Sequence, residues 1–488
     1  MTLPESLTFW SALAALAQLI IVTGVIVRVI LTRHPPGSAF AWILLTTILP
    51  YGGFLLYLVF GERPIGRLRA RYLRAAGNML ERIGAHRLTP FGPLPRHLAR
   101  HRTTLHLAAR LAGIPITTGS KAELKRSSEE TIASLHADIA AAERSIDMEF
   151  YIWDEGGEIR EVVSALISAA KRGVRIRILV DDFGSREFLR SESRRELEAA
   201  GIEVASALPM RLLQFFGMQR ADIRLHRKTV VIDGRIAYTG SFNMIDPKGY
   251  AEAATVGAWV DAMVRVEGPG ALSLDAVWHF DWALQPDSDL ADYERPPVEK
   301  PVPNTGNAVI ATVPSGPYQT GDRNLLLILE AINRAEHTLT ITTPYFIPTE
   351  SVVCALINAV MRGVRVKLIV PETSDTAATG WAMRRYFDDL LQAGVEILFY
   401  KGGLLHTKSI AVDREFAVFG TLNIDNRSMH LNFELMMAIF DADFVNALHE
   451  LHAEYETHCE RVLPELWRKR PLMNRLKEGA CYLISPLL

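Results

Sequence analysis

The chain begins with two long apolar stretches, and their pattern predicts membrane helices. Residues 9–31 contain one charged residue, Arg28, and residues 39–60 contain none. A helix needs about 20 apolar residues to cross the hydrocarbon core of a bilayer, and both stretches reach that length. Pro35, Pro36 and Gly37 lie between them and predict a turn. The pattern therefore predicts a transmembrane helical hairpin over residues 1–62, with a buried helix of a soluble domain as the alternative for the second stretch.

The segment after the second apolar stretch is basic. It contains Arg63, Arg67, Arg69, Arg71 and Arg74. Basic residues beside a membrane helix favour the cytoplasmic side, and the same charges suit contact with anionic lipid headgroups, so both roles stay open. We expect residues 63–115 to form a basic juxtamembrane linker. A cleaved signal peptide is disfavoured, because residues 1–7 hold no Lys or Arg and a second apolar stretch follows.

The rest of the chain contains an internal repeat. Residues 161–180 read EVVSALISAAKRGVRIRILV, and residues 351–370 read SVVCALINAVMRGVRVKLIV. Each predicts an amphipathic helix, a glycine turn and a β-branched strand, and alternating strands and helices indicate an α/β fold. The repeat predicts one lobe over residues 116–300 and a second lobe with a C-terminal helix over residues 301–488. The proline-rich residues 296–303 are the expected boundary.

The two copies differ in one segment. Gly201 and His226 are 25 positions apart in the first copy, whereas Gly394 and His406 are 12 apart in the second. The extra segment is apolar and contains Pro209, Met210, Leu212, Leu213, Phe215, Phe216 and Met218. It is either a longer loop packed on its own lobe or an apolar lip that receives acyl chains.

Both copies carry the same set of polar residues at the same spacing. His is followed by Lys two positions later, by Asp five positions after that Lys, and then by a Gly-[Ser/Thr]-x-Asn sequence. Because side chains alternate along a strand, His and Lys point to one face, and a hairpin after the Asp brings Ser or Thr and Asn back beside them. The residues are His226, Lys228, Asp233, Ser241 and Asn243 in the first copy and His406, Lys408, Asp413, Thr421 and Asn423 in the second.

These residue types suit the cleavage of a phosphodiester. A Lys ammonium and an Asn amide offset the phosphate charge, and a neutral imidazole attacks phosphorus to form a phosphohistidine. A second imidazole then serves as acid and base, so the two copies must face each other around one site. We expect His226 to be the nucleophile and His406 the acid/base, although the sequence leaves the reverse assignment open. Asp233 and Asp413 either act in the chemistry or orient the turn, where Asp is common.

Each histidine needs an acceptor for its second ring nitrogen, which fixes the tautomer. Glu434 is the candidate partner for His406, and Asp261 is the candidate in the first half.

Composition narrows the classes of partner. The formal net charge is −2, which argues against a nucleic-acid-binding protein with a global basic field. The spacing of Cys354, Cys459 and Cys481 fits neither a metal knuckle nor a disulfide framework and suits a reducing compartment. We expect no metal site and no cofactor.

The doubled HxKxxxxD and Gly-[Ser/Thr]-x-Asn pattern resembles the phospholipase D superfamily, and within it the bacterial cardiolipin synthases. The stretches that carry this resemblance are PPGSAFAWILLTTILPYGGFLLYLVFGE, FYIWDEGG, TPYFIPTE, YFDDLLQAGVEILFY, LLHTKSIAVD and GTLNIDNRSMHLNFEL. The resemblance implies two α/β sandwich lobes that form a pseudo-dimer around one metal-free active site. It also implies that the histidine, lysine and aspartate of both motifs are active-site residues, with Glu434 as the acid behind the second histidine.

The same resemblance implies a function and a location. It implies transfer of a phosphatidyl group from one phosphatidylglycerol to another, which gives cardiolipin and glycerol. A membrane-bound phospholipase D-type hydrolase, or a transphosphatidylase that uses another alcohol, is the alternative. Phosphatidylglycerol and other anionic phospholipids are the expected partners, without nucleic acid, and the oligomeric state stays open. The expected location is the bacterial cytoplasmic (inner) membrane, with a multi-pass anchor and the catalytic lobes on the cytoplasmic side.

Overall fold

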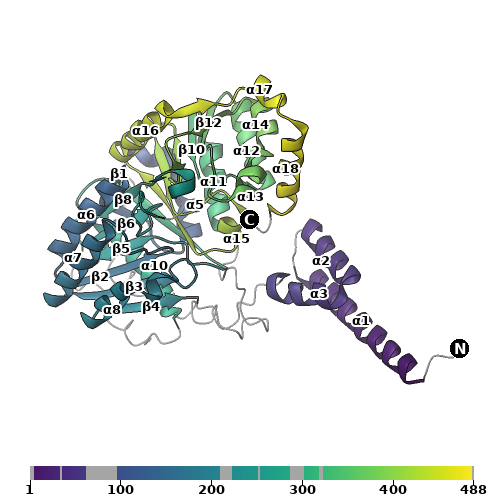
Figure 1. The fold of residues 1–488 in the computed structure, drawn as a ribbon. Coiled ribbons are helices and arrows are strands. Elements are labelled where there is room, and N and C mark those ends of the chain that lie inside the picture. Colours follow the sequence, from purple (N-terminus) through teal and green to yellow (C-terminus); the bar gives the residue numbers. More distant parts are fainter. Residues whose placement is uncertain are drawn as a thin grey trace. The chain divides into compact units, whose positions relative to one another are not determined.

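The computed structural model of the 488-residue chain describes residues 5–32, 36–61, 96–208, 223–250, 253–285, 302–317 and 322–485. The chain divides into two compact units (Figure 1). One comprises residues 1–67 and 210–223, and the other comprises residues 68–209 and 224–488. The predicted arginine cluster after residue 62 and the apolar segment from Pro209 to Met218 lie outside the described residues.

The N-terminal unit contains one long apolar helix, α1 (Glu5–Leu31), and several short elements. Within the described residues, Phe9–Leu31 is the one segment long and apolar enough to cross a membrane as a single helix. The second predicted span forms α2 (Pro36–Ile48), α3 (Pro50–Leu56) and a π-helical turn, η1 (Tyr57–Gly61). Leu49 leaves the helical conformation at φ −124° and ψ 73°. The second apolar stretch is therefore helical but interrupted at Leu49, because Pro50 restricts the residue before it and cannot donate an N–H.

The second unit begins with the helices and strands of the first half of the α/β body. Its elements are η2 (Arg96–His101), α5 (Arg102–Ala112), β1 (Thr117–Lys125), α6 (Ser128–Ala141), β2 (Ser145–Phe150), α7 (Ile159–Lys171), β3 (Arg175–Asp181), η3 (Phe188–Arg190), α8 (Glu192–Ala199), β4 (Glu203–Ala207), β5 (Thr229–Ile232), β6 (Ile236–Gly240), α9 (Ala253–Val256), β7 (Trp259–Val260), β8 (Met263–Glu267) and α10 (Pro269–Ala283).

The second half repeats this succession. Its elements are β9 (Ala308–Ser315), α11 (Arg323–Arg334), β10 (Thr338–Thr342), α12 (Glu350–Met361), β11 (Arg365–Pro371), α13 (Ala377–Arg384), α14 (Phe387–Ala393), β12 (Glu396–Tyr400), β13 (Leu404–Leu405), β14 (Ser409–Val412), β15 (Phe416–Gly420), α15 (Asn426–His430), β16 (Glu434–Phe440), α16 (Ala442–Thr457), β17 (Cys459–Arg461), α17 (Pro464–Arg468) and α18 (Leu472–Leu483).

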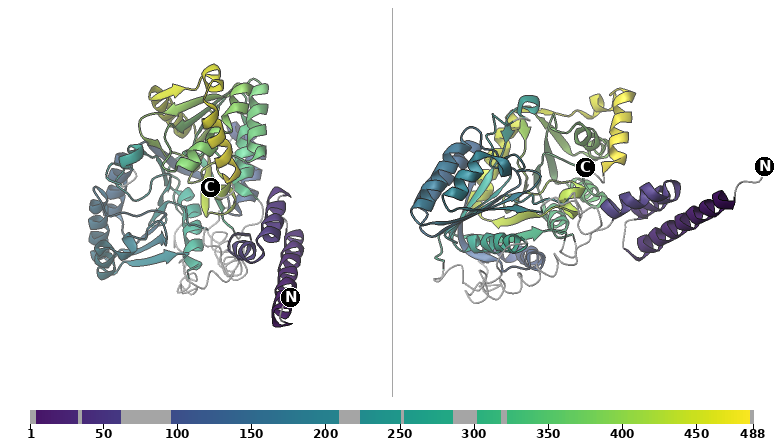
Figure 2. Two further views of the ribbon diagram at one scale, coloured as in Figure 1. Left: turned by 45° about the vertical axis from the view of Figure 1, so that its right-hand side comes forward. Right: turned by 60° about the horizontal axis from the view of Figure 1, so that its bottom comes forward.

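Strands β7 and β13 form a small sheet of their own, and the other strands of both halves form one mixed sheet with β17 at the edge beside β12. In the first half the order is β4-β3-β2-β5-β6-β8-β1, and in the second half it is β12-β11-β10-β14-β15-β16-β9. The first three strands of each order are parallel, and the others pair antiparallel. Antiparallel pairing of β1 with β9 joins the halves, with Thr117 opposite Ile310. The sequence repeat thus corresponds to two sheet halves with the same strand order, which lie side by side in both views of Figure 2.

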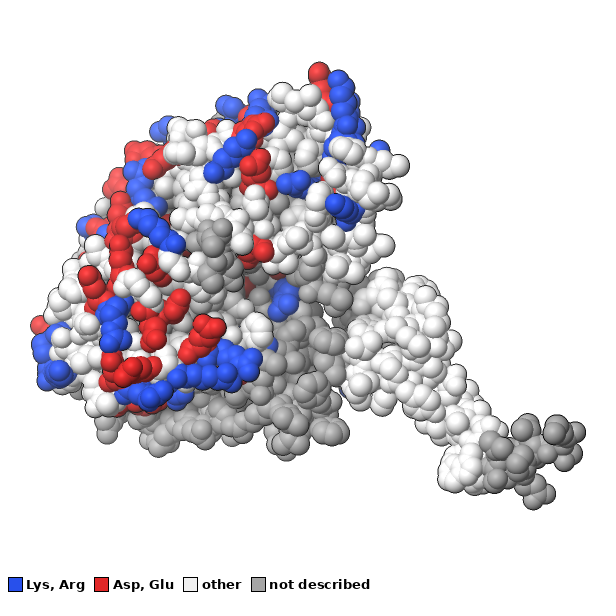
Figure 3. All heavy atoms as spheres, in the orientation of Figure 1, with Lys and Arg blue, Asp and Glu red and all other residues white. Residues whose placement is uncertain are grey.

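Burial follows the predicted amphipathic patterns. On α7, Val162, Val163 and Leu166 are buried, whereas Glu161 and Ser164 are exposed. The strands β5, β14 and β16 are buried along their whole length, as expected for strands covered on both faces. Acidic and basic side chains are interspersed over the face of the α/β body drawn in Figure 3, and the formal net charge of the whole chain is −2.

Candidate active site

The two His-x-Lys segments are positioned by strand pairing between the halves. The short strands β13 and β7 pair in parallel, with Leu404 opposite Trp259 and Leu405 opposite Val260. His406 is the residue that follows β13, and its backbone N–H donates to the carbonyl of Val260 at 2.9 Å.

The first motif is held in the corresponding way. An isolated parallel bridge joins Leu225 to Phe433, and the backbone N–H of the next residue, His226, donates to the carbonyl of Phe433 at 3.0 Å. An acid follows each of the two residues whose carbonyls accept these bonds. Asp261 follows Val260, and Glu434 follows Phe433. Parallel register therefore places one histidine beside one carboxylate at two equivalent positions.

Each imidazole contacts a carboxylate from the opposite half of the sheet. Nδ1 of His406 lies 2.7 Å from Oδ1 of Asp261 in an aligned hydrogen bond. Nδ1 of His226 lies 2.8 Å from Oε1 of Glu434, but this contact lacks hydrogen-bond alignment. The predicted pairing of Glu434 with His406, and of Asp261 with the first half, was wrong. The residues just before the acids, Val260 and Phe433, pair across the two halves, so each acid contacts the histidine of the other copy.

The two histidines line one cavity of about 710 Å³. Asn243 and Asn423 line the same cavity, which places one amide of each motif beside the imidazoles. The Asn243 side-chain oxygen accepts from the backbone N–H of Ile152 at 3.2 Å, whereas Oδ1 of Asn423 is buried without a hydrogen-bond partner among the described residues. The arrangement brings together the residues that sequence spacing predicted to converge.

Aromatic rings hold the imidazoles in place. The ring centroids of Tyr151 and His226 are 5.1 Å apart, and those of Trp259 and His406 are 4.5 Å apart. Both aromatic residues line the cavity. Packing of this kind restricts the orientation of each imidazole, because aromatic pairs prefer a limited set of geometries.

The motif lysines are buried beside the histidines and do not line the cavity. Nζ of Lys228 donates to the carbonyl of His226 at 2.8 Å, and Nζ of Lys408 donates to the carbonyl of His406 at 2.5 Å. Burial lowers the pKa of Lys228 to about 8 and holds the pKa of Lys408 well below its usual value. The two ammonium groups add positive potential at the site.

Both imidazoles are neutral at pH 7. Burial, followed by the positive charge of Lys228 and Lys408, holds the pKa of His226 well below its usual value. Burial lowers the pKa of His406 to about 4, and the charge of Asp261 opposes that shift. A neutral imidazole with Nδ1 facing an acceptor has its lone pair on Nε2, and this form is a nucleophile or a base.

The two acids differ in charge. Burial raises the pKa of Glu434 to about 7, so this carboxyl is partly protonated at neutral pH. Burial acts in the same direction on Asp261, but the electrostatic interaction and hydrogen bond with the His406 imidazole, together with the charge of Lys408, outweigh it and lower the pKa of Asp261. His406 therefore has the partner that better stabilises an imidazolium.

The hydroxyls of the two motifs make different contacts. Oγ1 of Thr421 donates to Oε2 of Glu434 at 2.6 Å and thereby orients that carboxyl. Oγ of Ser241 donates to the carbonyl of Ala262 at 3.2 Å and accepts from the N–H of the same residue at 3.0 Å. The Ser241 contacts hold β6 beside the segment that carries Asp261.

The motif aspartates lie at hairpin turns outside the cavity wall. The Asp233 carboxylate accepts from three successive backbone N–H groups that precede and begin β2, at 3.0, 2.7 and 2.9 Å. The Asp413 carboxylate accepts from the equivalent groups at β10, at 2.9, 2.8 and 2.6 Å. Both residues have positive φ, 54° and 49°, a conformation that Asp tolerates better than most residues. This geometry favours the structural role among the two roles considered from the sequence.

Several further residues line the cavity that sequence reasoning did not single out. They include Tyr151, Arg224, Trp259, Tyr345 and Arg427. Tyr345 donates its hydroxyl to Oδ2 of Asp375 at 2.5 Å. Tyr151 follows β2 within FYIWDEGG, and Tyr345 follows β10 within TPYFIPTE. This equivalent position in the two halves was the sequence feature that could have identified both tyrosines as site residues.

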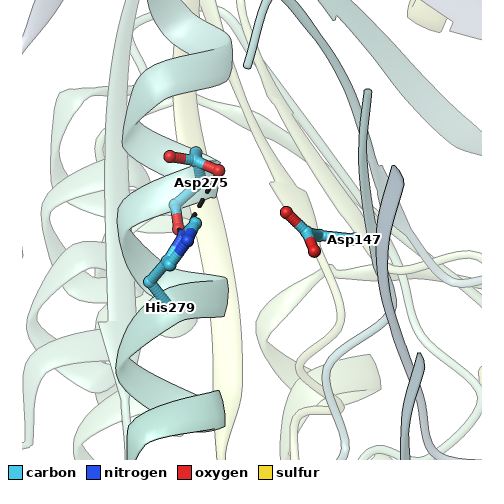
Figure 4. Close-up of side chains that lie close together, drawn as sticks. All are labelled: Asp147, Asp275 and His279. Carbon is cyan, nitrogen blue, oxygen red and sulfur yellow. Dashed lines mark hydrogen bonds and ion pairs between the residues drawn. The ribbon is translucent and has the colours of Figure 1, made fainter. Parts of the chain in front are cut away.

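A separate group of possible metal ligands occurs within the described residues: Asp147, Asp275 and His279 (Figure 4). The Arg177 guanidinium donates to both Asp147 oxygens, at 2.7 and 3.1 Å, and its Nη2 lies 3.1 Å from Nε2 of His279. The same guanidinium stacks on Trp278, with 4.4 Å between the guanidinium carbon and the ring centroid. Arg177 thus supplies the positive charge of this buried group. Its contacts with Asp147 and His279 link β3 to β2 and to α10.

Comparisons with known proteins agree with this architecture. The family model described as "Cardiolipin synthase, PLD-like domain" matches residues 135–255 and 328–461, and that described as "Phospholipase_D-nuclease N-terminal" matches residues 20–62. Cardiolipin synthase A of Proteus mirabilis is 37% identical over 99% of this chain and 100% of its own length. Cardiolipin synthase A of Klebsiella pneumoniae is 38% identical over 98% of both chains.

A solved structure shares the fold. Phosphatidylserine synthase of Haemophilus influenzae matches 79% of this chain and 100% of its own, with a TM-score of 0.59 and 13% identity. At this identity the match shows a common fold only. The full-length sequence matches, rather than the motifs alone, show the family. The chain belongs to the bacterial cardiolipin synthase family of the phospholipase D superfamily.

Proposed function

We propose that this protein is a cardiolipin synthase, a phosphatidyltransferase that joins two phosphatidylglycerol molecules into cardiolipin and releases glycerol. The observation that carries the proposal is that His226 and His406 line one cavity and each contacts a carboxylate. Membership of the cardiolipin synthase family supports the choice of substrate.

The first half of the reaction forms a phosphohistidine. Nε2 of His226 attacks the phosphorus of the donor lipid while the bond from phosphorus to the glycerol oxygen breaks. His406, as the imidazolium, gives its proton to that oxygen, and glycerol leaves. The negative phosphodiester raises the pKa of His406 on binding, because an opposite charge nearby favours the protonated form.

The second half of the reaction uses the same groups in reverse. His406, now neutral, takes the proton from a glycerol hydroxyl of the second phosphatidylglycerol. That oxygen attacks phosphorus, the phosphorus–nitrogen bond to His226 breaks, and cardiolipin forms. His406 is again the imidazolium, so protons and bonds balance over the cycle. The hydrogen bond from His406 to the ionised Asp261 supports its assignment as the acid/base.

The neighbouring polar groups suit the charge that develops on phosphorus. Lys228 and Lys408 supply positive potential, and the amides of Asn243 and Asn423 line the cavity where phosphoryl oxygens lie. Fixed donors and charges in a site with little water stabilise such a transition state strongly.

Product analysis tests the proposal. Purified full-length protein in mixed micelles is given phosphatidylglycerol labelled in the headgroup glycerol and, separately, in the diacylglycerol part. We expect labelled glycerol and labelled cardiolipin in equal amounts, and neither from a His226→Ala variant. Phosphatidic acid as the main lipid product favours the alternative, a hydrolase, and a mixed product with an added alcohol favours a broader transphosphatidylase. The phosphoenzyme is trapped under basic conditions, in which the phosphorus–nitrogen bond is stable. Peptide mapping should then place the label on His226, and a label on His406 reverses the assignment.

We also propose that the protein is a multi-pass protein of the bacterial inner membrane, with residues 1–62 as a helical hairpin and the α/β body in the cytoplasm. The apolar span Phe9–Leu31 and the apolar helices that follow it support this topology, as do the arginines after residue 62. Labelling of single cysteines in intact cells and in inverted vesicles tests it. Access to Ser168→Cys from the periplasmic side of intact cells contradicts it.

A further inference from the structure

The C-terminal helix α18 turns a charged side into the protein and an apolar side outward. The Glu478 side chain is 1% exposed, and Nε of Arg470 donates to its Oε1 at 3.0 Å. The apolar side chains Leu472, Met473, Leu476 and Leu483 are 69%, 61%, 57% and 79% exposed. Proteins in water normally show the reverse arrangement, and clustered exposed apolar side chains mark a surface that meets a partner or a membrane.

The apolar side chains form one continuous stripe. An α-helix turns by about 100° per residue, so Leu472, Met473, Leu476 and Leu483 fall within an arc of about 100°. On the same geometry Glu478 lies opposite the centre of this arc, and Arg475 and Lys477 lie about 60° and 40° beyond its two edges. An apolar stripe with a basic residue on each side is typical of a helix that lies in the plane of a membrane surface.

The charge around the stripe favours an anionic partner. Between Leu463 and Ser485 the chain has five basic and two acidic residues. Of the two acidic residues, Glu478 is buried against Arg470, which also contacts Asp388 at 2.8 and 2.7 Å. Arg468, Lys469, Arg475 and Lys477 give the exposed surface of α17 and α18 a net positive charge. Figure 3 shows mainly white surface with blue side chains over this part of the α/β body.

Helix α13 connects this surface to the cavity. Thr376 and Thr379, at the start of α13, line the cavity. Helix α18 packs against α13 (Figure 1). Nζ of Lys477 lies 5.2 Å from the centroid of the Trp381 ring. Phe183 of the first half also lines the cavity, and its side chain is exposed. The cavity wall therefore includes an exposed apolar residue. The exposed stripe therefore lies one helix away from the candidate active site.

We propose that α18 docks on the surface of an anionic bilayer, with Leu472, Leu476 and Leu483 among the acyl chains and Arg475 and Lys477 at the headgroup phosphates. This contact holds the cavity close to the lipid surface, so that a headgroup reaches the histidines while its acyl chains stay in the bilayer. The catalytic consequence rests on the proposed function, whereas the docking itself does not. The occupant of the stripe is lipid, rather than the N-terminal helices of this chain or a second copy.

Collision measurements on a spin label test the docking. The full-length chain is placed in nanodiscs of phosphatidylglycerol and phosphatidylcholine, with Cys354, Cys459 and Cys481 replaced by Ser and one label at Leu476→Cys. The control label is at Ser168→Cys, an exposed position on α7. Molecular oxygen partitions into the bilayer, and a nickel chelate stays in water. We expect the ratio of oxygen to nickel collisions to be several-fold higher at position 476 than at position 168, and to fall in discs of phosphatidylcholine alone.

Two results overturn the docking proposal. Equal ratios at the two positions mean that the stripe faces water. Low collision rates with both reagents at position 476 mean that protein covers it, either the N-terminal helices or a second copy. A ratio that is unchanged in phosphatidylcholine discs overturns the role of the basic residues.

Activity measurements separate docking from chemistry. A Leu472→Glu, Leu476→Glu double variant should lose most of its rate on phosphatidylglycerol in bilayers, and keep its rate on a short-chain phosphatidylglycerol dispersed as monomers. The matched control is Met361→Glu, because Met361 is also exposed and is the last residue of α12, at the end of the sheet away from Thr376. Equal losses on both substrates, or equal losses in the control, overturn the role in access. Wild-type protein that is inactive on both substrates instead overturns the proposed function and leaves the spin-label result standing.

Discussion

Replacement of Asp261 by Asn tests the contact between the halves most directly. The substitution keeps the size of the side chain and one acceptor oxygen for Nδ1 of His406, which lies 2.7 Å from the carboxylate. It removes the negative charge that stabilises the imidazolium. Because Asp261 is buried and its pKa is lowered, the charge is present throughout the neutral range.

The magnitude follows from electrostatics. An imidazolium and a carboxylate whose charge centres lie about 4 Å apart attract by about 4 kcal/mol at an effective dielectric constant of about 20. The amide keeps part of the contact, so we expect a loss of about 3 kcal/mol, which corresponds to a rate about 100-fold lower. The same loss lowers the pKa of His406 by about 2 units. Since His406 must be protonated to release glycerol, the falling limb of the pH–rate profile should move to lower pH by a similar amount.

The assay measures glycerol release from phosphatidylglycerol micelles between pH 5 and 9, with circular dichroism as a check on folding. The matched control is Glu434→Gln, at the acid that contacts His226. Because the pKa of Glu434 is about 7, its charge is only partly present at neutral pH, and its replacement should cost about tenfold or less. A Glu434→Gln variant slower than Asp261→Asn, or an Asp261→Asn variant with an unmoved pH profile, would refute this assignment.

Three further predictions concern other parts of the α/β body. Asp233→Ala removes the acceptor of three backbone N–H groups, so the free energy of unfolding should fall by about 3 kcal/mol, at about 1 kcal/mol each, measured by chemical denaturation. Besides the fall due to His406, the rate should fall further as pH rises through about 8, because the Lys228 ammonium then loses its charge. A Lys228→Arg variant should lack this further fall in a pH series up to 9. Arg177→Met leaves the buried Asp147 carboxylate without its cation and should cost about 3–5 kcal/mol of stability, read from thermal unfolding.

Each of these predictions has a clear contrary result. Asp233→Ala protein with wild-type stability but no activity indicates a chemical role for that carboxylate. A Lys228→Arg variant whose rate falls with pH as steeply as that of wild type up to pH 9 argues against a required Lys228 charge. An Arg177→Met variant that is rescued by divalent cations, and not otherwise unstable, indicates that the group around Asp147 and His279 holds a metal ion.

The sequence by itself determined much of the local structure and the composition of the site. The helix-and-strand periodicity around residues 161–180 and 351–370 predicted α7, β3, α12 and β11, because side-chain burial follows the period of each element. The doubled spacing of His, Lys and Asn predicted the convergence of two motifs, since one motif supplies only one imidazole. Pro50 was also a local signal, and its effect on the second apolar stretch follows from its missing N–H.

Only the tertiary structure decided which acid serves which histidine. Asp261 and His406 are 145 positions apart in the chain, and their contact depends on the parallel pairing of β7 with β13. Such a pairing is chosen by the way the two halves of the sheet meet, and no local pattern encodes it. The placement of Asp233 and Asp413 was likewise undecided by spacing, because a turn aspartate can face a cavity or fold back on backbone N–H groups. Local sequence sets which groups are available, and the long-range fit of the sheet sets which of them touch.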